Sequence, residues 1–322
     1  MKNKLLYKLR SGKNPKFIYY SVNALRLIIP KGIFRLRLQG KLSSLSRRKD
    51  KDYIERRVDY YNKLSGTVQL PSSAPHLSEH KMSKQKVYFF DTYQYTRWFS
   101  DQFQWGFCPG DVTFVPDYPS IVKSRPLTDD NVNSIVMKLD KVRHFIFVDD
   151  KKAFTEKKNM VIFRGKVKGK PSRKLFMEMY FHHPMCDLGD VSKNTADPAE
   201  WRTEKKTINE HLDYKFIMAL EGIDVASNLK WVMSSNSIAV MPRPTCETWF
   251  MEGTLIPNYH YIEIKPDFSD LEERLNYYIE HVDESLEIIR HEYVSQFKDK
   301  RRENLISLLV LDKYFKMTGQ KS

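Results

Sequence analysis

The segment from residue 214 to residue 241 alternates apolar runs of strand length with a glycine turn and a helical pattern. The runs Tyr214–Leu220 and Ser237–Met241 predict two buried strands. Between them, Glu221–Asp224 predicts a turn, and Val225–Asn236 predicts a helix with apolar side chains on one face. A strand, a turn, a helix and a second strand with so little connecting chain indicate an α/β fold.

The glycine of this turn, Gly222, suggests a ligand. Free backbone N–H groups and the helix dipole favour an anion where a buried strand leads into a helix, and open α/β sheets hold phosphate groups at such turns. The segment is therefore the best candidate for a nucleotide site. Many units with this pattern bind nothing, so the assignment needs support from other residues.

Positive charge is concentrated at the N-terminus. Residues 1–49 contain 14 Lys or Arg and no Asp or Glu, and the net charge of the 322-residue chain is +14. The rest of the chain is therefore electrically balanced, and the basic character belongs to an N-terminal arm. Within this arm, Phe17–Ile29 is a largely apolar run without a small-residue cleavage site after it. It is too short to cross a bilayer, which takes roughly 20 residues.

We expect this arm to form a cationic amphipathic element that lies on an anionic membrane surface. A nucleic-acid-binding arm and a purely solvated basic face are the alternatives.

The hydrophobic content of 41% predicts a folded core. Three widely spaced cysteines, Cys108, Cys186 and Cys246, include no Cys-x-x-Cys pair. This argues against a disulfide framework or a zinc site and fits a reducing compartment.

Strands and helices are predicted to alternate in two blocks after the arm, which indicates two Rossmann-like domains facing across a cleft. In the first block we expect strands at 86–90, 111–116 and 143–148 and helices at 50–64 and 91–103. In the second block we expect strands at 160–163, 184–188, 214–220, 237–241 and 260–264, and helices at 172–181, 225–236, 271–281, 283–297 and 302–315. The expected domains are residues 50–155, joined by a C-terminal helix at about 300–318, and residues 156–299.

Two further features bear on chemistry. Residues 163–173 place five cations and two glycines between a predicted strand and a predicted helix, a composition that suits phosphate. Asp117 follows the predicted strand at 111–116, and strand carboxyl ends carry the functional groups of open α/β sheets. A solvated basic loop and a capping aspartate are the structural alternatives. The sequence has no P-loop, Gly-x-Gly-x-x-Gly, Gly-x-Ser-x-Gly or His-Glu-x-x-His motif.

A set of spaced motifs extends from about Asp111 to His281. It consists of Asp117-Tyr118-Pro119, Phe163-Arg164-Gly165, Pro171-Ser172-Arg173, His211-x-x-Tyr214-Lys215-Phe216 before Gly222, Ser237, Trp249, and His260-Tyr261 leading to Lys265-x-x-x-Ser269-Asp270-Leu271. Together these motifs resemble glycosyltransferase family 90, which includes protein O-glucosyltransferases, capsule xylosyltransferases and bacterial lipopolysaccharide glycosyltransferases. The stretch from Asp224 to Trp231 looks most like the bacterial lipopolysaccharide branch.

The resemblance implies a GT-B fold, a nucleotide-sugar donor that is usually a UDP-sugar, and an inverting transfer without a metal or other cofactor. Asp117 matches the family's catalytic base, and Arg173 matches an arginine that binds the donor diphosphate. Lys166 falls on a donor-contacting serine of the glucosyltransferases. The other positions assigned to the donor site are Arg164, Gly165, Lys168, Lys215, Gly222, Asp224, Val225, Ala226, Ser227 and Asn228.

One position departs from the family pattern. The glucosyltransferases have a second phosphate-binding arginine where this chain has Asn228, and Lys230 and Lys168 are the candidates to supply that charge. This departure leaves the identity of the donor open. The sequence shows no signal peptide and no endoplasmic-reticulum retention tail. We therefore expect the cytoplasmic, bacterial branch of the family, located at the inner face of the cytoplasmic membrane.

The sequence thus predicts an enzyme that adds a sugar to a hydroxyl of a lipopolysaccharide or lipooligosaccharide acceptor, with Tyr118, Lys123 and Arg125 near that acceptor. The first alternative is a metal-dependent GT-A glycosyltransferase with Asp149 and Asp150 as metal ligands. The second alternative is a basic-armed adaptor for a membrane or RNA. The neutral body of the chain argues against nucleic acid as the main ligand. The transferred sugar, the accepting hydroxyl and the oligomeric state are left open.

Overall fold

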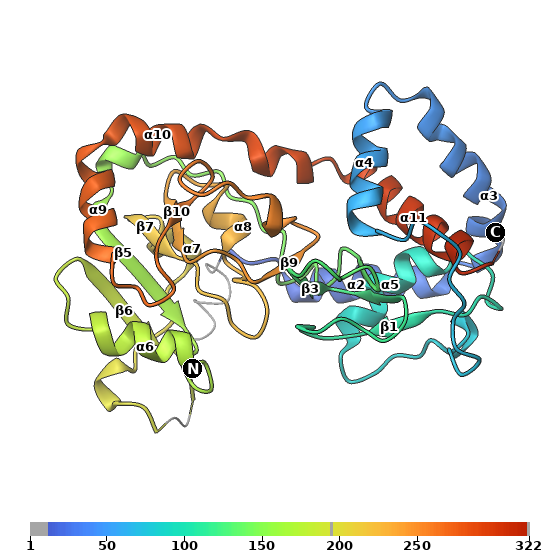
Figure 1. Ribbon diagram of the computed structural model, residues 1–322, viewed down its shortest axis with the longest axis horizontal. Coiled ribbons are helices and arrows are strands. Elements are labelled where there is room, and N and C mark those ends of the chain that lie inside the picture. The colour runs from blue at the N-terminus through green and yellow to red at the C-terminus, as the bar shows by residue number, and fades with distance from the viewer. Residues whose placement is uncertain (1–11, 194–195, 321–322) are drawn as a thin grey trace. The chain divides into compact units, whose positions relative to one another are not determined.

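The computed structural model describes residues 12–193 and 196–320, so residues 1–11 of the expected basic arm lie outside the described part. The chain divides into two compact units (Figure 1). Unit 1 comprises residues 143–244 and 254–296, together with residues 12–14 at the start of the described chain. Unit 2 comprises residues 15–142, 245–253 and 297–320.

Unit 1 is built on a five-stranded sheet in which every strand pair is parallel. Its strands are β5 (Lys158–Gly165), β6 (Cys186–Asp190), β7 (Tyr214–Met218), β8 (Ile238–Met241) and β10 (Ile262–Glu263), in the spatial order β10-β8-β7-β5-β6. The chain runs from β5 outward to β6 and then returns to the other side of β5 with β7. In such doubly wound sheets the ligand crevice lies at the carboxyl ends of the strands that flank this reversal.

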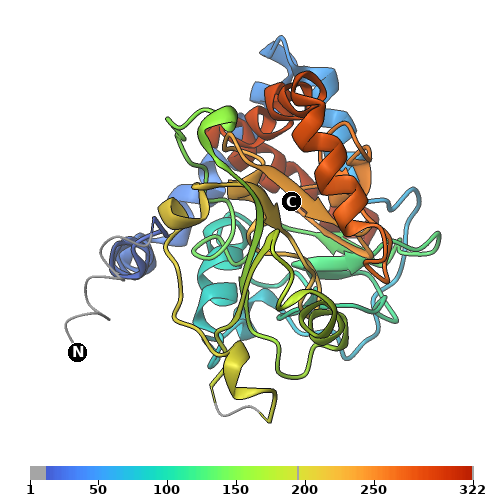
Figure 2. The same cartoon turned by 90° about the vertical axis from the view of Figure 1, so that its left-hand side faces the viewer.

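One face of this sheet is covered by α6 (Pro171–Tyr180), α9 (Leu271–Glu280) and α10 (Val282–Arg290). Alternate strand residues such as Val161 and Phe163 share a buried core with Phe176 of α6 and Leu275 of α9. Figures 1 and 2 show α9 and α10, in orange to red, running along the sheet. The remaining helical elements are short: α7 (Ile208–His211), α8 (Leu229–Val232), and the 3₁₀ turns η3 (Phe154–Glu156), η4 (Ala199–Trp201) and η6 (Glu292–Phe297).

Unit 2 combines a small parallel sheet with helices from both ends of the chain. The sheet has the order β1-β2-β4, with β1 (Gly106–Cys108), β2 (Ser120–Val122) and β4 (Ser134–Val136), and β3 (Ser124–Pro126) pairs antiparallel with β9 (Cys246–Thr248). The helices are α2 (Lys16–Ile28), α3 (Lys31–Ser43), α4 (Lys51–Tyr61), α5 (Lys86–Thr96) and α11 (Lys300–Met317), with 3₁₀ turns η1 (Ser44–Arg47), η2 (Leu77–Glu79) and η5 (Glu252–Thr254). Helix α11 packs against α3, α4 and α5.

The mixed α/β class with parallel sheets is confirmed, and the predicted strands of the second block all appear, although β10 has only two residues. Three predicted strands of the first block are wrong. Residues 86–90 begin helix α5, which is buried on several sides and therefore lacks the periodicity of an amphipathic helix. Around Val112, the side-chain hydroxyl of Ser124 bonds both backbone groups and takes the place of a strand partner. Phe145 interrupts residues 143–148 with a φ of 55°.

The helix predicted at 225–236 is also wrong in length, because only the single turn α8 forms. Residues 222–225 make a bend, and the hydroxyls of Ser234 and Ser235 bond the carbonyl oxygens of Trp231 and Val232 at the end of the turn. Among the described residues, no helix has both the length and the apolar character needed to cross a bilayer.

Candidate active site

In unit 1, β5 and β7 flank the reversal of strand order, so doubly wound sheets predict a ligand site at the loops that follow these two strands. We call this position the crevice of unit 1. The first loop carries Lys166 and Lys168 and leads into α6, and the second runs from Ala219 to Asp224. The structure therefore brings together two of the segments that the sequence assigned to the donor site. Both loops lie at the carboxyl edge of the sheet, the edge at which open α/β sheets bind their ligands.

Arg173, in the first turn of α6, joins these two loops. Its Nη1 donates to the carbonyl oxygen of Lys166 at 3.0 Å. Its Nε donates to the carbonyl oxygen of Glu221 at 3.0 Å, and its Nη2 donates to that of Leu220 at 2.7 Å. These partners are neutral, so the positive charge of the guanidinium is not cancelled by them. Burial lowers the pKa of Arg173 from its ordinary value, and an anionic ligand in the crevice would offset this cost.

Gly222 lies against this arginine. A Cβ at residue 222 would come within 3.3 Å of Nη2 of Arg173, tighter than an ordinary van der Waals contact, so the glycine permits the close approach of the loop to the guanidinium. The loop after β5 is fixed from its other side. Asp190 Oδ1 accepts hydrogen bonds from the backbone N–H groups of Val167, at 3.0 Å, and Ser192, at 2.7 Å. The loop therefore presents exposed Lys166 and Lys168 from a fixed backbone.

The turn after β7 contributes less than the sequence suggested. Asp224, Val225 and Ala226 are buried, and Ser227 is exposed. The side-chain amide of Asn228 donates to the carbonyl oxygen of Met218 at 3.0 Å, which fixes the turn to the end of β7. Because α8 is a single turn, the helix dipole that we predicted behind Gly222 does not support an anion here. The candidate donor groups are thus concentrated on the β5 side of the crevice.

Arg164 lies close in sequence to the crevice but is engaged elsewhere. Its guanidinium forms an ion pair with Asp187, and Nη1 donates to the carbonyl oxygen of the same residue at 2.7 Å. Burial alone would raise the pKa of Asp187, but hydrogen bonds from Tyr214 and Arg164 lower it below its usual value. Gly165 is a packing position, because a Cβ there would come within 2.4 Å of the Phe163 ring.

Two lysines are buried, one assigned to the donor site and one considered as a substitute for the missing phosphate-binding arginine. Lys215 is the second residue of β7, away from the carboxyl edge, and its ammonium lies 5.0 Å from the centroid of the Phe154 ring. Burial lowers the pKa of Lys215. Lys230 is completely buried. The structure therefore does not bring Lys215 together with Arg173, and of the two lysines considered as substitutes for the missing arginine, Lys168 is the exposed one.

The candidate base lies in unit 2. We predicted that Asp117 follows a strand, and this is wrong. The residue lies in the loop before β2, where its side chain is exposed. The backbone on either side is held: Asn133 Nδ2 donates to the carbonyl oxygens of Pro116 and Asp117, at 3.0 and 3.1 Å. Tyr314 Oη donates to the carbonyl oxygen of Pro119 at 2.9 Å. An exposed carboxylate on a fixed backbone is suited to act as a general base.

Gly106 completes this support. Its backbone N–H donates to Tyr314 Oη at 2.8 Å, and a Cβ at residue 106 would come within 2.5 Å of the carbonyl oxygen of Pro119. Only glycine therefore allows β1 to approach the Asp117 loop this closely. Sequence reasoning missed Gly106, Asn133 and Tyr314 because they come from β1, from the turn before β4 and from α11, and share no local motif.

Of the three residues predicted to lie near the acceptor, one is partly exposed and two are buried. Tyr118 is partly exposed beside Asp117. Lys123 is buried and paired with Asp111, and Arg125 is completely buried. Arg125 donates from Nε to Glu247 at 2.7 Å and from Nη2 to the carbonyl oxygen of Tyr60 at 2.8 Å. Lys123 and Arg125 thus lie in the interior of unit 2 and are not presented to an acceptor.

The residues considered as metal ligands are used in ion pairs. Asp149 pairs with Lys151 at 2.7 Å, and both are exposed. Asp150 accepts from Lys157 Nζ at 2.7 Å and from the backbone N–H of Asn236 at 3.0 Å. Within residues 12–193 and 196–320, no group of three His, Cys, Asp or Glu side chains is placed to hold a metal ion.

Comparison with known proteins identifies relatives. The sequence pattern of "Glycosyl transferase family 90" matches residues 127–318, a stretch that begins C-terminal to Asp117. The chain is also 39% identical over 267 residues to "O-glucosyltransferase LpsA" of Dichelobacter nodosus. That similarity covers 82% of this chain and 83% of the relative. The crevice residues Arg173 and Gly222 lie within the family match.

Proposed function

Because the chain belongs to glycosyltransferase family 90 and is therefore a glycosyltransferase, we propose that it transfers a glucosyl residue from a nucleotide sugar to a hydroxyl of a lipopolysaccharide or lipooligosaccharide acceptor. The observation that carries this proposal is the 39% identity to an O-glucosyltransferase over four-fifths of the chain. A UDP-sugar is the proposed donor. This choice of nucleotide follows from the resemblance to the family.

The donor diphosphate is proposed to bind in the crevice of unit 1. Arg173 supplies a fixed positive charge, since three neutral carbonyl oxygens hold its guanidinium between the two loops. Exposed Lys166 and Lys168 stand on the same loop and can contact phosphate oxygens. As the bond to the sugar breaks, negative charge grows on the leaving diphosphate, and preorganised cations stabilise it. In this proposal no metal ion is needed.

Asp117 is proposed as the general base. Its carboxylate accepts the proton of the acceptor hydroxyl while the oxygen attacks the anomeric carbon from the face opposite the diphosphate, which inverts the configuration. The exposed position of Asp117 and the hydrogen bonds to its flanking backbone support this role. Fixed geometry matters because a base that is displaced by about 1 Å loses much of its effect.

We also propose a GT-B architecture, with unit 2 as the acceptor-side domain and unit 1 as the donor domain. The parallel sheet of each unit and the membership of α11 in unit 2 support this assignment. The basic arm, of which α2 and α3 are the described part, is proposed to keep the enzyme at the inner face of the cytoplasmic membrane. The absence of Asp or Glu in residues 1–49 supports attraction to anionic lipid.

A donor screen followed by a transfer assay tests this function. We expect UDP-glucose to raise the unfolding temperature more than UDP-galactose, UDP-xylose, UDP-N-acetylglucosamine or GDP- and ADP-sugars, because only a binding ligand stabilises the folded state. The purified enzyme should then move labelled glucose to a deacylated lipopolysaccharide acceptor, with full activity in EDTA. Loss of activity in EDTA would favour the metal-dependent alternative. Stabilisation by another sugar nucleotide alone, without glucose transfer, would overturn the proposed donor.

A further inference from the structure

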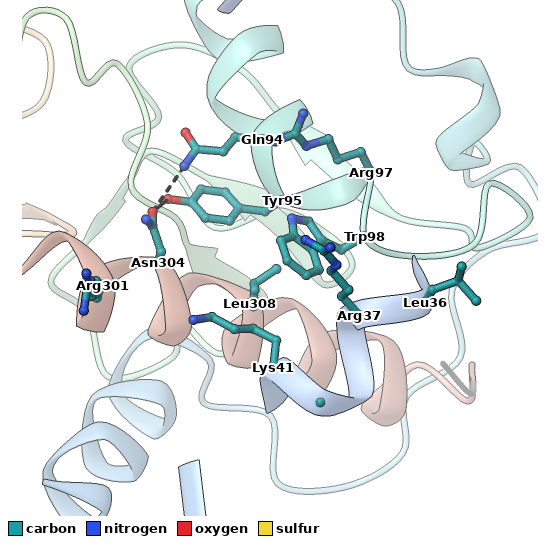
Figure 3. Close-up of a pocket in the computed structure, with 11 residues that line it drawn as sticks. Leu36, Arg37, Lys41, Gln94, Tyr95, Arg97, Trp98, Arg301, Asn304 and Leu308 are labelled. Carbon is teal, nitrogen blue, oxygen red and sulfur yellow. Dashed lines mark hydrogen bonds between the residues drawn. The ribbon is translucent and has the colours of Figure 1, made fainter. Parts of the chain in front are cut away.

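Unit 2 contains a pocket of about 780 Å³ between helices α3, α5 and α11 (Figure 3). This volume is in the range that binds small molecules and headgroups. Trp98 and Leu308 contribute apolar lining. Asn304 accepts hydrogen bonds from Tyr95 Oη at 2.8 Å and Gln94 Nε2 at 3.2 Å on its carbonyl oxygen, which leaves its amide N–H groups as donors. None of the residues that line this pocket belongs to the loop of Asp117 or to unit 1.

The lining of this pocket is strongly cationic. Arg37 and Lys41 come from α3, Arg97 follows α5, and Arg301 lies in the first turn of α11, whereas no lining residue is acidic. Figure 3 shows the side chains of Arg37 and Lys41 rising from one helix, with Arg301 on the neighbouring one. Four cations without a carboxylate repel one another, and an anion bound among them would relieve this repulsion.

Arg97 gives the clearest sign of a missing anion. It is only 7% exposed, and its Nε has no hydrogen-bond partner within the described residues. Its guanidinium lies 3.7 Å from the centroid of the Phe34 ring, and Nη1 donates to the carbonyl oxygen of Arg26 at 3.0 Å. These contacts are neutral, so the buried charge has no counterion among them. Buried cations in folded proteins are normally paired with an anion.

The helices beside the pocket present an unusual apolar surface. Helix α2 turns polar side chains inward: Tyr19 donates to Asp91 Oδ1 at 2.8 Å, and Arg26 donates to Gln94 Oε1 at 3.0 Å. Its outer side exposes large apolar residues, which are Phe17, Ile18, Val22, Leu25 and Ile28, and Ile29 directly after the helix is also exposed. On α3, Leu36 is 88% exposed and belongs to the pocket lining. Apolar side chains next to a cationic pocket fit the boundary between lipid headgroups and acyl chains.

We propose that this pocket binds the phosphate group of an anionic phospholipid headgroup while the outer side of α2 and Leu36 contact the acyl region. This inference rests on the proposed function, which places the enzyme at a membrane, and it names the site that would bind the lipid. Arg97 supplies the buried charge, Arg37, Lys41 and Arg301 complete the cation set, and Asn304 donates hydrogen bonds. The basic arm therefore acts through one pocket and not only through diffuse attraction.

The test compares charge removal inside and outside the pocket. The triple variant Arg37→Gln, Lys41→Gln, Arg301→Gln removes three exposed or partly exposed pocket cations, and the control Arg47→Gln, Lys49→Gln, Arg56→Gln removes three exposed cations of the same unit that do not line it. We prefer substitution to deletion of the arm, because Tyr19 and Lys31 of the arm bond Asp91 and Asp101. Deletion would remove these hydrogen bonds and disturb the fold of unit 2. Binding of the full chain to phosphatidylcholine vesicles containing phosphatidic acid is measured by co-sedimentation.

We expect the pocket variant to bind about tenfold more weakly than wild type, and the control variant to lose less than about threefold. Glycerol phosphate should compete with vesicles for the wild type and the control, whereas sodium chloride at equal ionic strength should compete less. Equal losses in the two variants, or no competition by glycerol phosphate, would overturn the pocket in favour of diffuse attraction. Glucose transfer to a soluble acceptor should stay unchanged in both variants. This transfer assay tests the proposed function separately, since the vesicle assay needs neither donor nor acceptor.

Discussion

The hydroxyl of Tyr314, in the last helix of the chain, donates a hydrogen bond to the carbonyl oxygen of Pro119, in the loop that carries Asp117. The same hydroxyl accepts from the buried backbone N–H of Gly106. We predict that Tyr314→Phe lowers kcat, because the loop loses one of its fixed points, and destabilises the protein by about 1–3 kcal/mol, because the N–H of Gly106 loses its partner. The KM for the donor should change little, since the proposed donor residues lie in unit 1. Tyr277→Phe, an exposed tyrosine bonded to Glu284, is the matched control.

Replacing Asp117 tests the proposed general base directly. Asp117→Asn keeps the size of an exposed side chain and should leave the fold and the donor affinity intact. We expect kcat to fall by about a hundredfold or more, because a positioned base contributes at least that factor. Steady-state kinetics and donor titration separate the two effects. Asp130→Asn, an exposed aspartate of the same unit, should retain full activity, and an active Asp117→Asn enzyme would remove Asp117 from the mechanism.

Arg173 is predicted to act on the donor. Arg173→Lys keeps the charge but cannot make the three hydrogen bonds that link the loops after β5 and β7. We expect the loss in kcat/KM to correspond to about 2–4 kcal/mol, the usual effect of removing one preorganised contact to a developing charge. Lys174→Gln, at the next position of α6, should have little effect because Lys174 is exposed and its ion pair with Glu178 lies on the surface. Similar kinetics for the two variants would contradict a donor role for Arg173.

Unit 1 could be predicted from the sequence because of the way its strands are buried. Parallel strands that are covered on both faces read as continuous apolar runs, and Gly222 and Pro242 mark where two of these runs end. The charged loop around Arg173 was found for the same reason, since it fills the interval between one such run and a helix. Helix α8 was overestimated because its apolar spacing continues beyond residue 232, while the serine hydroxyls that end it carry no periodic signal.

Unit 2 could not be predicted in the same way. Its strands have three residues each, which is too short for an alternation to show. Asp117 was found through a resemblance of motifs, but its surroundings were not, because Tyr314 is 195 positions from Pro119 in the chain. Arg125 looked like a ligand-binding cation, and only the tertiary structure brings Glu247 against it. Contacts between distant residues therefore decide which charges of unit 2 are structural.

Stability should decline as the pH falls, and His80 is predicted to contribute. Burial among the rings of Phe89 and Trp105 lowers its pKa to about 4. In the unfolded chain the imidazole takes up its proton near pH 6.5, whereas in the folded protein it does so only near its lowered pKa. Between these values the unfolded state binds more protons, so the free energy of unfolding falls by at most about 1.4 kcal/mol per pH unit from this group. Urea melts at several pH values should show a weaker dependence for His80→Gln, while exposed His182→Gln should match wild type.

The buried carboxylate of Glu303 should be the most sensitive charge in unit 2. It accepts from Arg57 Nη1 at 2.6 Å, from Trp249 Nε1 at 2.6 Å and from Lys138 Nζ at 3.0 Å, and only 3% of its side chain is exposed. Glu303→Gln keeps the shape but leaves two cations without their counterion. We expect a loss of about 3–5 kcal/mol in the free energy of unfolding, because an uncompensated buried charge costs more than its pair contributes.

The matched comparison for Glu303 is the pair of Lys313 and Asp59, which joins the same two helices, α11 and α4, at 2.8 Å on the surface. Water already solvates the side chain of Asp59, so Asp59→Asn should cost less than about 1 kcal/mol. Chemical denaturation of the two variants separates burial from ion pairing, since both lose one carboxylate between the same helices. Equal losses in the free energy of unfolding for the two variants would mean that other groups compensate Arg57 and Lys138. The stability of unit 2 would then not depend on the carboxylate of Glu303.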